Sequence, residues 1–172
     1  NIAIEEIETP TIAPTEVLVR AERSLISRGS ELWRRYAREE AIDPRIMGYS
    51  LAGQVVEVGA QVEGFAPGDR VAALAPHAEY AAMEVVAPAH RPSVVKLPAG
   101  VPAEAGTFWP LATSSVLWME ELASQWCDVV VILGQGLVGS GCMQVLKALT
   151  GARAIAVDAL PPRCALARQL GA

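Results

Sequence analysis

Apolar and polar residues alternate in short runs over roughly the first hundred residues of the chain. An alternation with a period of two is typical of strands that bury one face. Prolines and glycines separate these runs, which favours a β-barrel or β-sandwich. The predicted strands are Glu16–Arg20, Leu51–Val58, Arg70–Leu74, Glu79–Val86 and Ser93–Leu97. A short helix is predicted at Glu31–Arg38.

The pattern changes after Gly100. Residues Pro102–Ser124 have helical spacing, and Pro110 is expected to divide them into two helices. Val129–Leu133 is wholly apolar, which is typical of a strand buried on both faces of a parallel sheet. The remaining predicted elements are a helix at Leu137–Leu149, a strand at Ala154–Val157 and a helix at Pro162–Leu170. We therefore expect two domains, residues 1–124 and 125–172, the second opening with a βαβ unit of an α/β fold.

A glycine-rich turn joins the strand at Val129–Leu133 to the helix that follows. Gly134 permits the tight turn, and Gly136 lets the backbone approach a pyrophosphate. Gly139 lets the helix pack close to the strand. Leu137 and Val138 begin the helix, whose free N–H groups and positive dipole end favour phosphate binding.

An acidic residue, Asp158, follows the second predicted strand of this region. It lies 19 residues past Gly139, about where a ribose-binding acid is expected. A carboxylate there accepts hydrogen bonds from the ribose hydroxyls and repels a 2′-phosphate, so NAD(H) is predicted in preference to NADP(H). Arg163 either stacks near the adenine or faces solvent, and it would partly offset the repulsion. The alternative interpretation is a glycine-rich turn beside a solvated aspartate.

The order of these parts resembles the medium-chain dehydrogenase/reductase family, the alcohol dehydrogenase-like proteins. The segments that carry the resemblance are Pro14–Val19, Gly48–Gly59, Phe65–Val71 and Val94–Pro98. The resemblance implies a GroES-like β-barrel catalytic domain with bridging helices, followed by the start of a Rossmann, doubly wound parallel domain. Only the first strands of that nucleotide-binding domain are present, so we expect a truncated or partial chain, inactive in isolation.

The residues that bind the catalytic zinc of that family are replaced in this sequence. Arg28–Glu31 reads Arg-Gly-Ser-Glu where the zinc enzymes carry Cys-Gly-Thr-Asp. Tyr49 and Ser50 stand where they carry a histidine and a glutamate. A catalytic zinc site needs three protein ligands drawn from Cys, His and carboxylates. The resemblance therefore implies a zinc-independent member.

Without zinc, a hydrogen-bond donor has to stabilise charge on the substrate oxygen. Ser30 holds the position of the family's relay hydroxyl and is the first candidate, although it would also suit the N-cap of the predicted helix. Tyr49 would point its phenol into the same space or simply fill it. Arg28 would anchor an anionic substrate group, or pair with Glu31, or face solvent.

The remaining histidine and aromatic residues have simple structural explanations. His77 and His90 are flanked by proline and alanine in predicted loops and are expected at the surface. Four aromatic residues would wall an apolar substrate cleft or belong to the core. They are Trp33, Tyr36, Phe108 and Trp109.

Composition narrows the function classes. The net charge of -5, with no basic block, argues against nucleic-acid binding. No apolar run approaches the roughly 20 residues of a membrane span, and the first residues do not resemble a signal peptide. Cys127, Cys142 and Cys164 are too scattered for a disulfide framework, so we expect a cytoplasmic protein with reduced thiols.

The leading interpretation is a zinc-independent, NAD(H)-linked oxidoreductase that transfers hydride to or from a small carbonyl or alcohol substrate. An NADPH-dependent enone or quinone reductase is the alternative enzyme. A catalytically inactive nucleotide-binding scaffold or regulatory protein is the alternative without catalysis. Members of the resembled family are often oligomeric, so a homo-oligomer is left open.

Overall fold

The chain forms two compact units, Asn1–Trp109 and Pro110–Ala172. The computed structural model describes residues 3–32, 47–85, 92–125 and 127–172. Helix α3 (Trp109–Leu122) lies almost wholly in the second unit and contributes Met119 to that unit's core. The sequence had placed this helix in the first domain.

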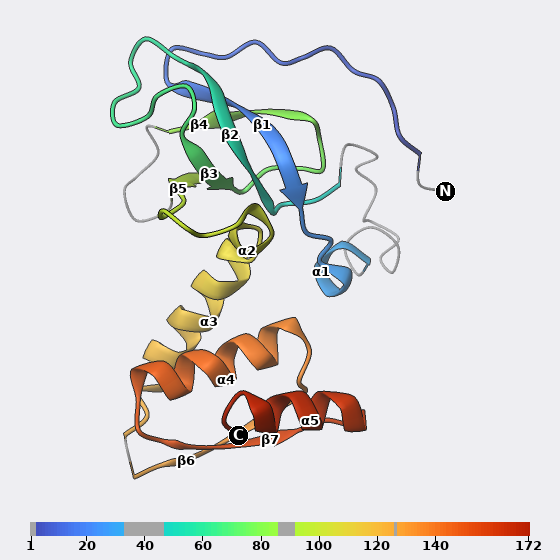
Figure 1. The fold of residues 1–172 in the computed structure, drawn as a ribbon, viewed down its shortest axis with the longest axis vertical. Coiled ribbons are helices and arrows are strands. Elements are labelled where there is room, and N and C mark those ends of the chain that lie inside the picture. Colours follow the sequence, from blue (N-terminus) through green and yellow to red (C-terminus); the bar gives the residue numbers. More distant parts are fainter. Residues whose placement is uncertain (1–2, 33–46, 86–91, 126) are drawn as a thin grey trace. The chain divides into compact units, whose positions relative to one another are not determined.

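The first unit is built on a five-stranded antiparallel sheet (Figure 1). Its strands pair in the order β4-β1-β2-β3-β5. They are β1 (Glu16–Ser24), β2 (Leu51–Val58), β3 (Arg70–Ala73), β4 (Tyr80–Glu84) and β5 (Val94–Lys96). Each corresponds to a predicted strand, and β2 has the predicted bounds.

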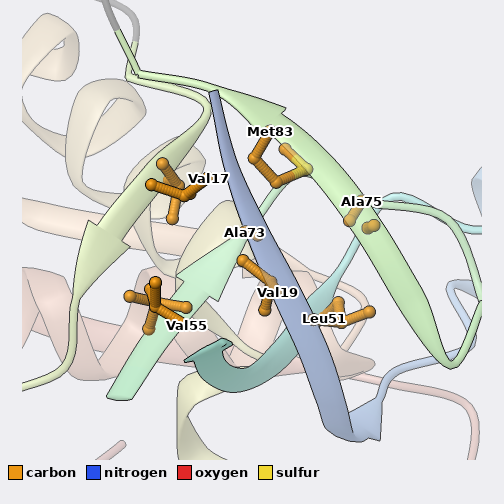
Figure 2. Packing of buried hydrophobic residues seen from close by; sticks show 10 residues of the cluster. Val17, Val19, Leu51, Val55, Ala73, Ala75 and Met83 are labelled. Atoms are coloured by element: carbon orange, nitrogen blue, oxygen red, sulfur yellow. The ribbon is translucent and has the colours of Figure 1, made fainter. Parts of the chain in front are cut away.

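The main core cluster of this unit lies on one face of the sheet. Leu18, Ala52 and Ala72 point to the other face and are buried as well, so the one-sided burial that the alternating pattern predicts is only partly observed. Val17 and Val19 of β1 are fully buried, and Figure 2 shows them among side chains from β2, β3 and β4. Gly53 of β2 permits a close approach of β1, because a Cβ atom there would lie 2.1 Å from the carbonyl oxygen of Arg20. The strands therefore pack with no room for a side chain at that position.

Two short helices accompany the sheet. Helix α1 (Arg28–Leu32) begins three residues before the predicted helix, and the rest of the predicted segment lies outside the described residues. Helix α2 (Ala103–Gly106) ends before Pro110. The break in the predicted helical stretch therefore precedes Pro110, which is the second residue of α3, because proline fits the first turn of a helix.

The second unit contains the predicted βαβ unit. Its elements after α3 are β6 (Val129–Leu133), α4 (Leu137–Leu149), β7 (Arg153–Val157) and α5 (Pro161–Gln169). Strands β6 and β7 pair in parallel, from Val129 opposite Arg153 to Leu133 opposite Val157. Met143 and Leu146 of α4 pack with residues of both strands on one face of this pair.

The prediction that β6 is buried on both faces is wrong for the described residues. Val130 and Ile132 face the core, but Val129, Val131 and Leu133 are exposed, Leu133 by 80%. The reason is that α4 covers only one face of the strand pair. No described helix is long and apolar enough to cross a membrane.

Candidate functional site

The glycine turn between β6 and α4 has three distinct geometries. Gly134 has a φ of 86°, in the left-handed region that favours glycine. A Cβ atom on Gly139 would lie 1.8 Å from the carbonyl oxygen of Gly134, so only glycine permits this approach of helix to turn. A Cβ atom on Gly136 would meet nothing within 4 Å. Gly136 is also the N-cap residue of α4, so the open space adjoins a helix N-terminus.

Gln135, between the first two glycines, ties the turn to both strands. Its backbone N–H donates to Oδ2 of Asp158 at 2.7 Å, and its side-chain amide donates to the carbonyl of Ile132 at 3.2 Å. The N–H of Gly134 donates to the carbonyl of Val157 at 2.7 Å. These bonds hold the turn against the end of β7, where Asp158 follows.

Asp158 is bound by three donors. Besides Gln135, the N–H of Leu160 donates to Oδ1 at 2.8 Å, and Nη1 of Arg163 lies 3.4 Å from Oδ2. The hydrogen bond from Gln135, then that from Leu160, and the Arg163 guanidinium hold the pKa of the Asp158 carboxyl below its usual value. The carboxylate is therefore ionised near neutral pH. Arg163 pairs with it, an arrangement that neither sequence interpretation of Arg163 had included.

These residues fit a dinucleotide. The space beside Gly136 admits a phosphate group to the N-terminus of the 13-residue helix α4. The ionised Asp158 has two oxygens and about four lone-pair sites, of which three meet Gln135, Leu160 and Arg163, so one remains for a ribose hydroxyl. Its side chain is 6% exposed. Leu137 and Val138 form the first turn of α4, where their N–H groups face the same end of the helix.

A second group of polar residues lies in the first unit, around the buried carboxylate of Glu31. We call Ser27, Glu31, Tyr49 and His77 the Glu31 cluster. The N–H of Ser27 donates to Oε1 of Glu31 at 2.6 Å, and Nε2 of His77 lies 3.1 Å from Oε2. The phenol of Tyr49 donates to Oγ of Ser27 at 2.7 Å. Three separate segments of the chain thus meet in one connected network.

The expectation that His77 is a surface residue is wrong. Its side chain is only 23% exposed, that of Glu31 only 6%, and the two form an ion pair whenever the imidazole is protonated. Gly48 makes room for the ring, because a Cβ atom there would lie 2.7 Å from two ring carbons. The backbone N–H of His77 also donates to the carbonyl of Met47 at 2.6 Å, which fixes the backbone of the residue that carries the ring.

The other two predicted catalytic residues, Ser30 and Arg28, are not part of the Glu31 cluster. Ser30 lies inside α1, which begins at Arg28, so it is not the N-cap of a helix that begins at Glu31. Arg28 is exposed, and both oxygens of Glu31 contact Ser27 and His77. Among the predicted aromatic residues, Phe108 is partly exposed and Trp109 begins α3. The predictions for Trp33, Tyr36 and His90 lie outside the described residues.

Zinc does not fit the residues at the replaced positions. Arg28 and Tyr49 belong to residue types that do not supply the ligands of such a site. Within the part of the chain that the structure describes, no group of three His, Cys, Asp or Glu side chains could hold a metal ion. We therefore derive no step through a metal.

The chain is similar to known dehydrogenases and reductases. Residues 13–109 match the family described as the alcohol dehydrogenase GroES-like domain. The chain is 28% identical over 202 aligned residues to an L-threonine 3-dehydrogenase of Bacillus velezensis, covering 98% of the chain and 56% of the relative. It is 31% identical over 183 residues to a 2-methylene-furan-3-one reductase of Solanum lycopersicum, covering 96% and 45%.

A solved structure has the same fold. An oxidoreductase/dehydrogenase of unknown specificity from Escherichia coli matches with a TM-score of 0.83 and 26% identity, over 96% of this chain and 56% of that one. The chain thus spans about half the length of these proteins. The match to the solved structure extends over 96% of the chain and therefore includes residues of both units.

Proposed function

Since this chain belongs to the alcohol dehydrogenase-like, medium-chain dehydrogenase/reductase family, we propose that it is part of a zinc-independent, NAD(H)-linked oxidoreductase. The substrate is a small alcohol or carbonyl compound. The observation that carries the proposal is the ionised Asp158 beside the glycine turn, with its carboxylate bound to the N–H of Gln135. The reduced thiols of Cys127, Cys142 and Cys164 are compatible with a cytoplasmic enzyme.

The proposal assigns a role to each of these residues. Gly134, Gly136 and Gly139 shape the turn, and the N-terminus of α4 binds the pyrophosphate. Asp158 binds the ribose hydroxyls. A bound nicotinamide supplies or accepts the hydride, and the protein has to stabilise charge and handle a proton at the substrate oxygen. Tyr49, with Ser30 and Arg28 of α1, remains a candidate for that task.

Cofactor choice is the first test. Intrinsic protein fluorescence is titrated with NADH and with NADPH, using the full-length protein, wild type and Asp158→Ser. We expect NADH to bind the wild type at least about tenfold more tightly than NADPH, because a carboxylate repels a 2′-phosphate. Tighter binding of NADPH by the wild type would contradict the proposal.

An NADPH-dependent enone or quinone reductase is the second candidate. Arg163 favours it, because a guanidinium next to the ribose site would pair with a 2′-phosphate once released from Asp158. The similarity to a 2-methylene-furan-3-one reductase also favours it. Turnover of enones with NADPH, and none of secondary alcohols with NAD⁺, would select this candidate. Stoichiometric zinc in the purified protein, measured by elemental analysis, would contradict zinc independence.

A further inference from the structure

We propose that His77, held by Glu31, is the acid–base residue of this enzyme, and that proton transfer takes place at its Nδ1 atom. This inference rests on the proposed function, because it concerns the proton that accompanies hydride transfer. Neither residue was a catalytic candidate in the sequence. Their pairing becomes visible only in the folded chain, where they are 46 residues apart in sequence.

The carboxylate of Glu31 fixes the hydrogen on one side of the imidazole ring. An ionised carboxylate only accepts hydrogen bonds. Nε2 of His77, 3.1 Å from Oε2, therefore carries the hydrogen in the neutral ring. Nδ1 is then a lone-pair acceptor in the neutral ring and a donor in the imidazolium. Glu31 also stabilises the imidazolium, as the carboxylate does in other carboxylate–histidine pairs.

The Nδ1 atom has no hydrogen-bond partner in the described structure, although it is buried. A buried polar atom without a partner costs free energy, and such atoms deserve a functional explanation. Here the explanation is an acceptor kept away from bulk water for the hydroxyl of a substrate.

The ring is held in place on two further sides. Gly48 lies directly against the ring, and the N–H of His77 is bound to the carbonyl of Met47. The second oxygen of Glu31 is bound by the N–H of Ser27, so the carboxylate cannot turn away. This orientation is what an acid–base residue needs. The titratable and charged groups on the elements that meet here are Glu31, Arg28, Tyr49 and Glu79, of which Arg28 and Glu79 are exposed.

In oxidation, the O–H bond of the alcohol breaks and its proton passes to the lone pair of Nδ1. A bound oxidised nicotinamide would accept the hydrogen of the adjacent carbon together with its electron pair, and the alcohol carbon would become the carbon of a C=O bond. In reduction, the carbon receives the hydride and the Nδ1–H of the imidazolium returns the proton to the oxygen.

The first experiment tests the pair without any cofactor. ¹⁵N-histidine labelling of the full-length protein is combined with His77→Gln, which identifies the His77 signals by their loss. We expect the neutral ring of His77 to carry its hydrogen on Nε2, with a downfield N–H proton that disappears in Glu31→Gln. A neutral ring with its hydrogen on Nδ1 overturns the proposal even if NADH binds.

The second experiment measures hydride transfer by the full-length protein with NAD⁺ and a panel of secondary alcohols, L-threonine among them, as a function of pH. The assay uses the alcohol that the wild type oxidises fastest. We expect His77→Gln to lower kcat by about 10²- to 10⁴-fold. We also expect kcat of the variant to lose the decrease at low pH that protonation of an imidazole causes in the wild type. Glu31→Gln, which preserves the shape of the side chain, is expected to cause a large part of this loss of kcat. His90→Asn, which changes another histidine, is the matched control.

The outcomes separate the two proposals. NADH binding within about twofold of the wild type in both variants shows that their cofactor site is intact. A His77→Gln variant with kcat within about threefold of the wild type and an unchanged pH profile overturns the acid–base role alone. Failure of the wild type to bind NADH overturns the proposed function, whereas the tautomer measurement still tests the pair. Binding of NADH without turnover of any alcohol overturns both.

Discussion

Two glycines of the same turn are expected to respond in opposite ways to the addition of one methyl group. In Gly139→Ala the new Cβ atom would lie 1.8 Å from the carbonyl oxygen of Gly134. An ordinary carbon–oxygen contact is about 3.3 Å, so backbone has to move by about 1.5 Å. In Gly136→Ala the new atom meets nothing within 4 Å, and the residue's φ of -77° suits alanine.

The free energies of unfolding follow from these distances. Overpacking costs about 1–3 kcal/mol, and Gly139→Ala belongs at the upper end because the methyl carbon is fixed directly to the helix backbone and the atom that it meets is a backbone oxygen. The gain in helix propensity, at most about 1 kcal/mol, offsets part of it. A net loss of about 2 kcal/mol lowers the Tm by about 4–8 °C in a protein of this size class. For Gly136→Ala, a capping loss of about 0.5–1 kcal/mol is offset by about 0.4–1 kcal/mol from the unfolded chain.

The assay is thermal unfolding by circular dichroism, followed by NADH titration of the variants that remain folded. Gly136→Ala should unfold within about 2 °C of the wild type. Its methyl group should instead clash with the bound pyrophosphate and raise the Kd for NADH by about 5- to 150-fold. A Gly139→Ala variant as stable as the wild type would refute the packing argument. Unchanged NADH affinity in Gly136→Ala would refute the placement of the pyrophosphate.

Three further changes have expected outcomes. Asp158→Ser should weaken NADH binding and strengthen NADPH binding, because it removes the repulsion and frees Arg163; unchanged cofactor preference in the two titrations would contradict this. The Tm of the wild type should fall as the pH drops below about 4, because a carboxyl whose pKa is lowered by folding stabilises the protein above its usual pKa and loses that effect as the pH falls through the folded pKa. Asp158→Asn should reduce this fall in Tm. An identical fall in both proteins would argue against the contribution of Asp158. Gly48→Ala should destabilise the first unit and displace the His77 ring, since its φ is 103° and a Cβ atom would lie 2.7 Å from two ring carbons; an unchanged Tm and histidine spectrum would rule this out.

Elements set by local pattern could be predicted from the sequence. β2, β6 and α4 have the predicted bounds, because long apolar periodicity and flanking glycines specify them locally. The burial of β6 was less predictable. Its apolar residues on both faces fit a doubly wound sheet, but the described helices cover only one face. Burial depends on which elements pack on a strand, and that is not a local property.

The position of α1 and of His77 could not be read from local pattern. His77 lies between Pro76 and Ala78, which suggests an exposed loop. Its partner Glu31 lies 46 residues earlier, and no spacing rule joins them. The available signal was Gly48, a glycine with positive φ whose missing side chain leaves room for the ring. α1 begins at Arg28 rather than at Glu31 because the carboxylate of Glu31 binds the N–H that precedes the helix, that of Ser27.

The Glu31 cluster is chemically compatible with the proposed zinc independence. The side chain of Glu31 is only 6% exposed. Burial of a carboxylate costs free energy of folding unless hydrogen-bond donors surround it. Ser27 and His77 supply those donors, so the carboxylate is stable without a metal ion. Tyr49, at the position of a family zinc ligand, donates to Ser27 and extends the network instead of competing for the carboxylate. Replacing the ligands by tyrosine and arginine is therefore consistent with a polar centre that handles protons through an imidazole, which is the property that the tautomer and pH measurements test.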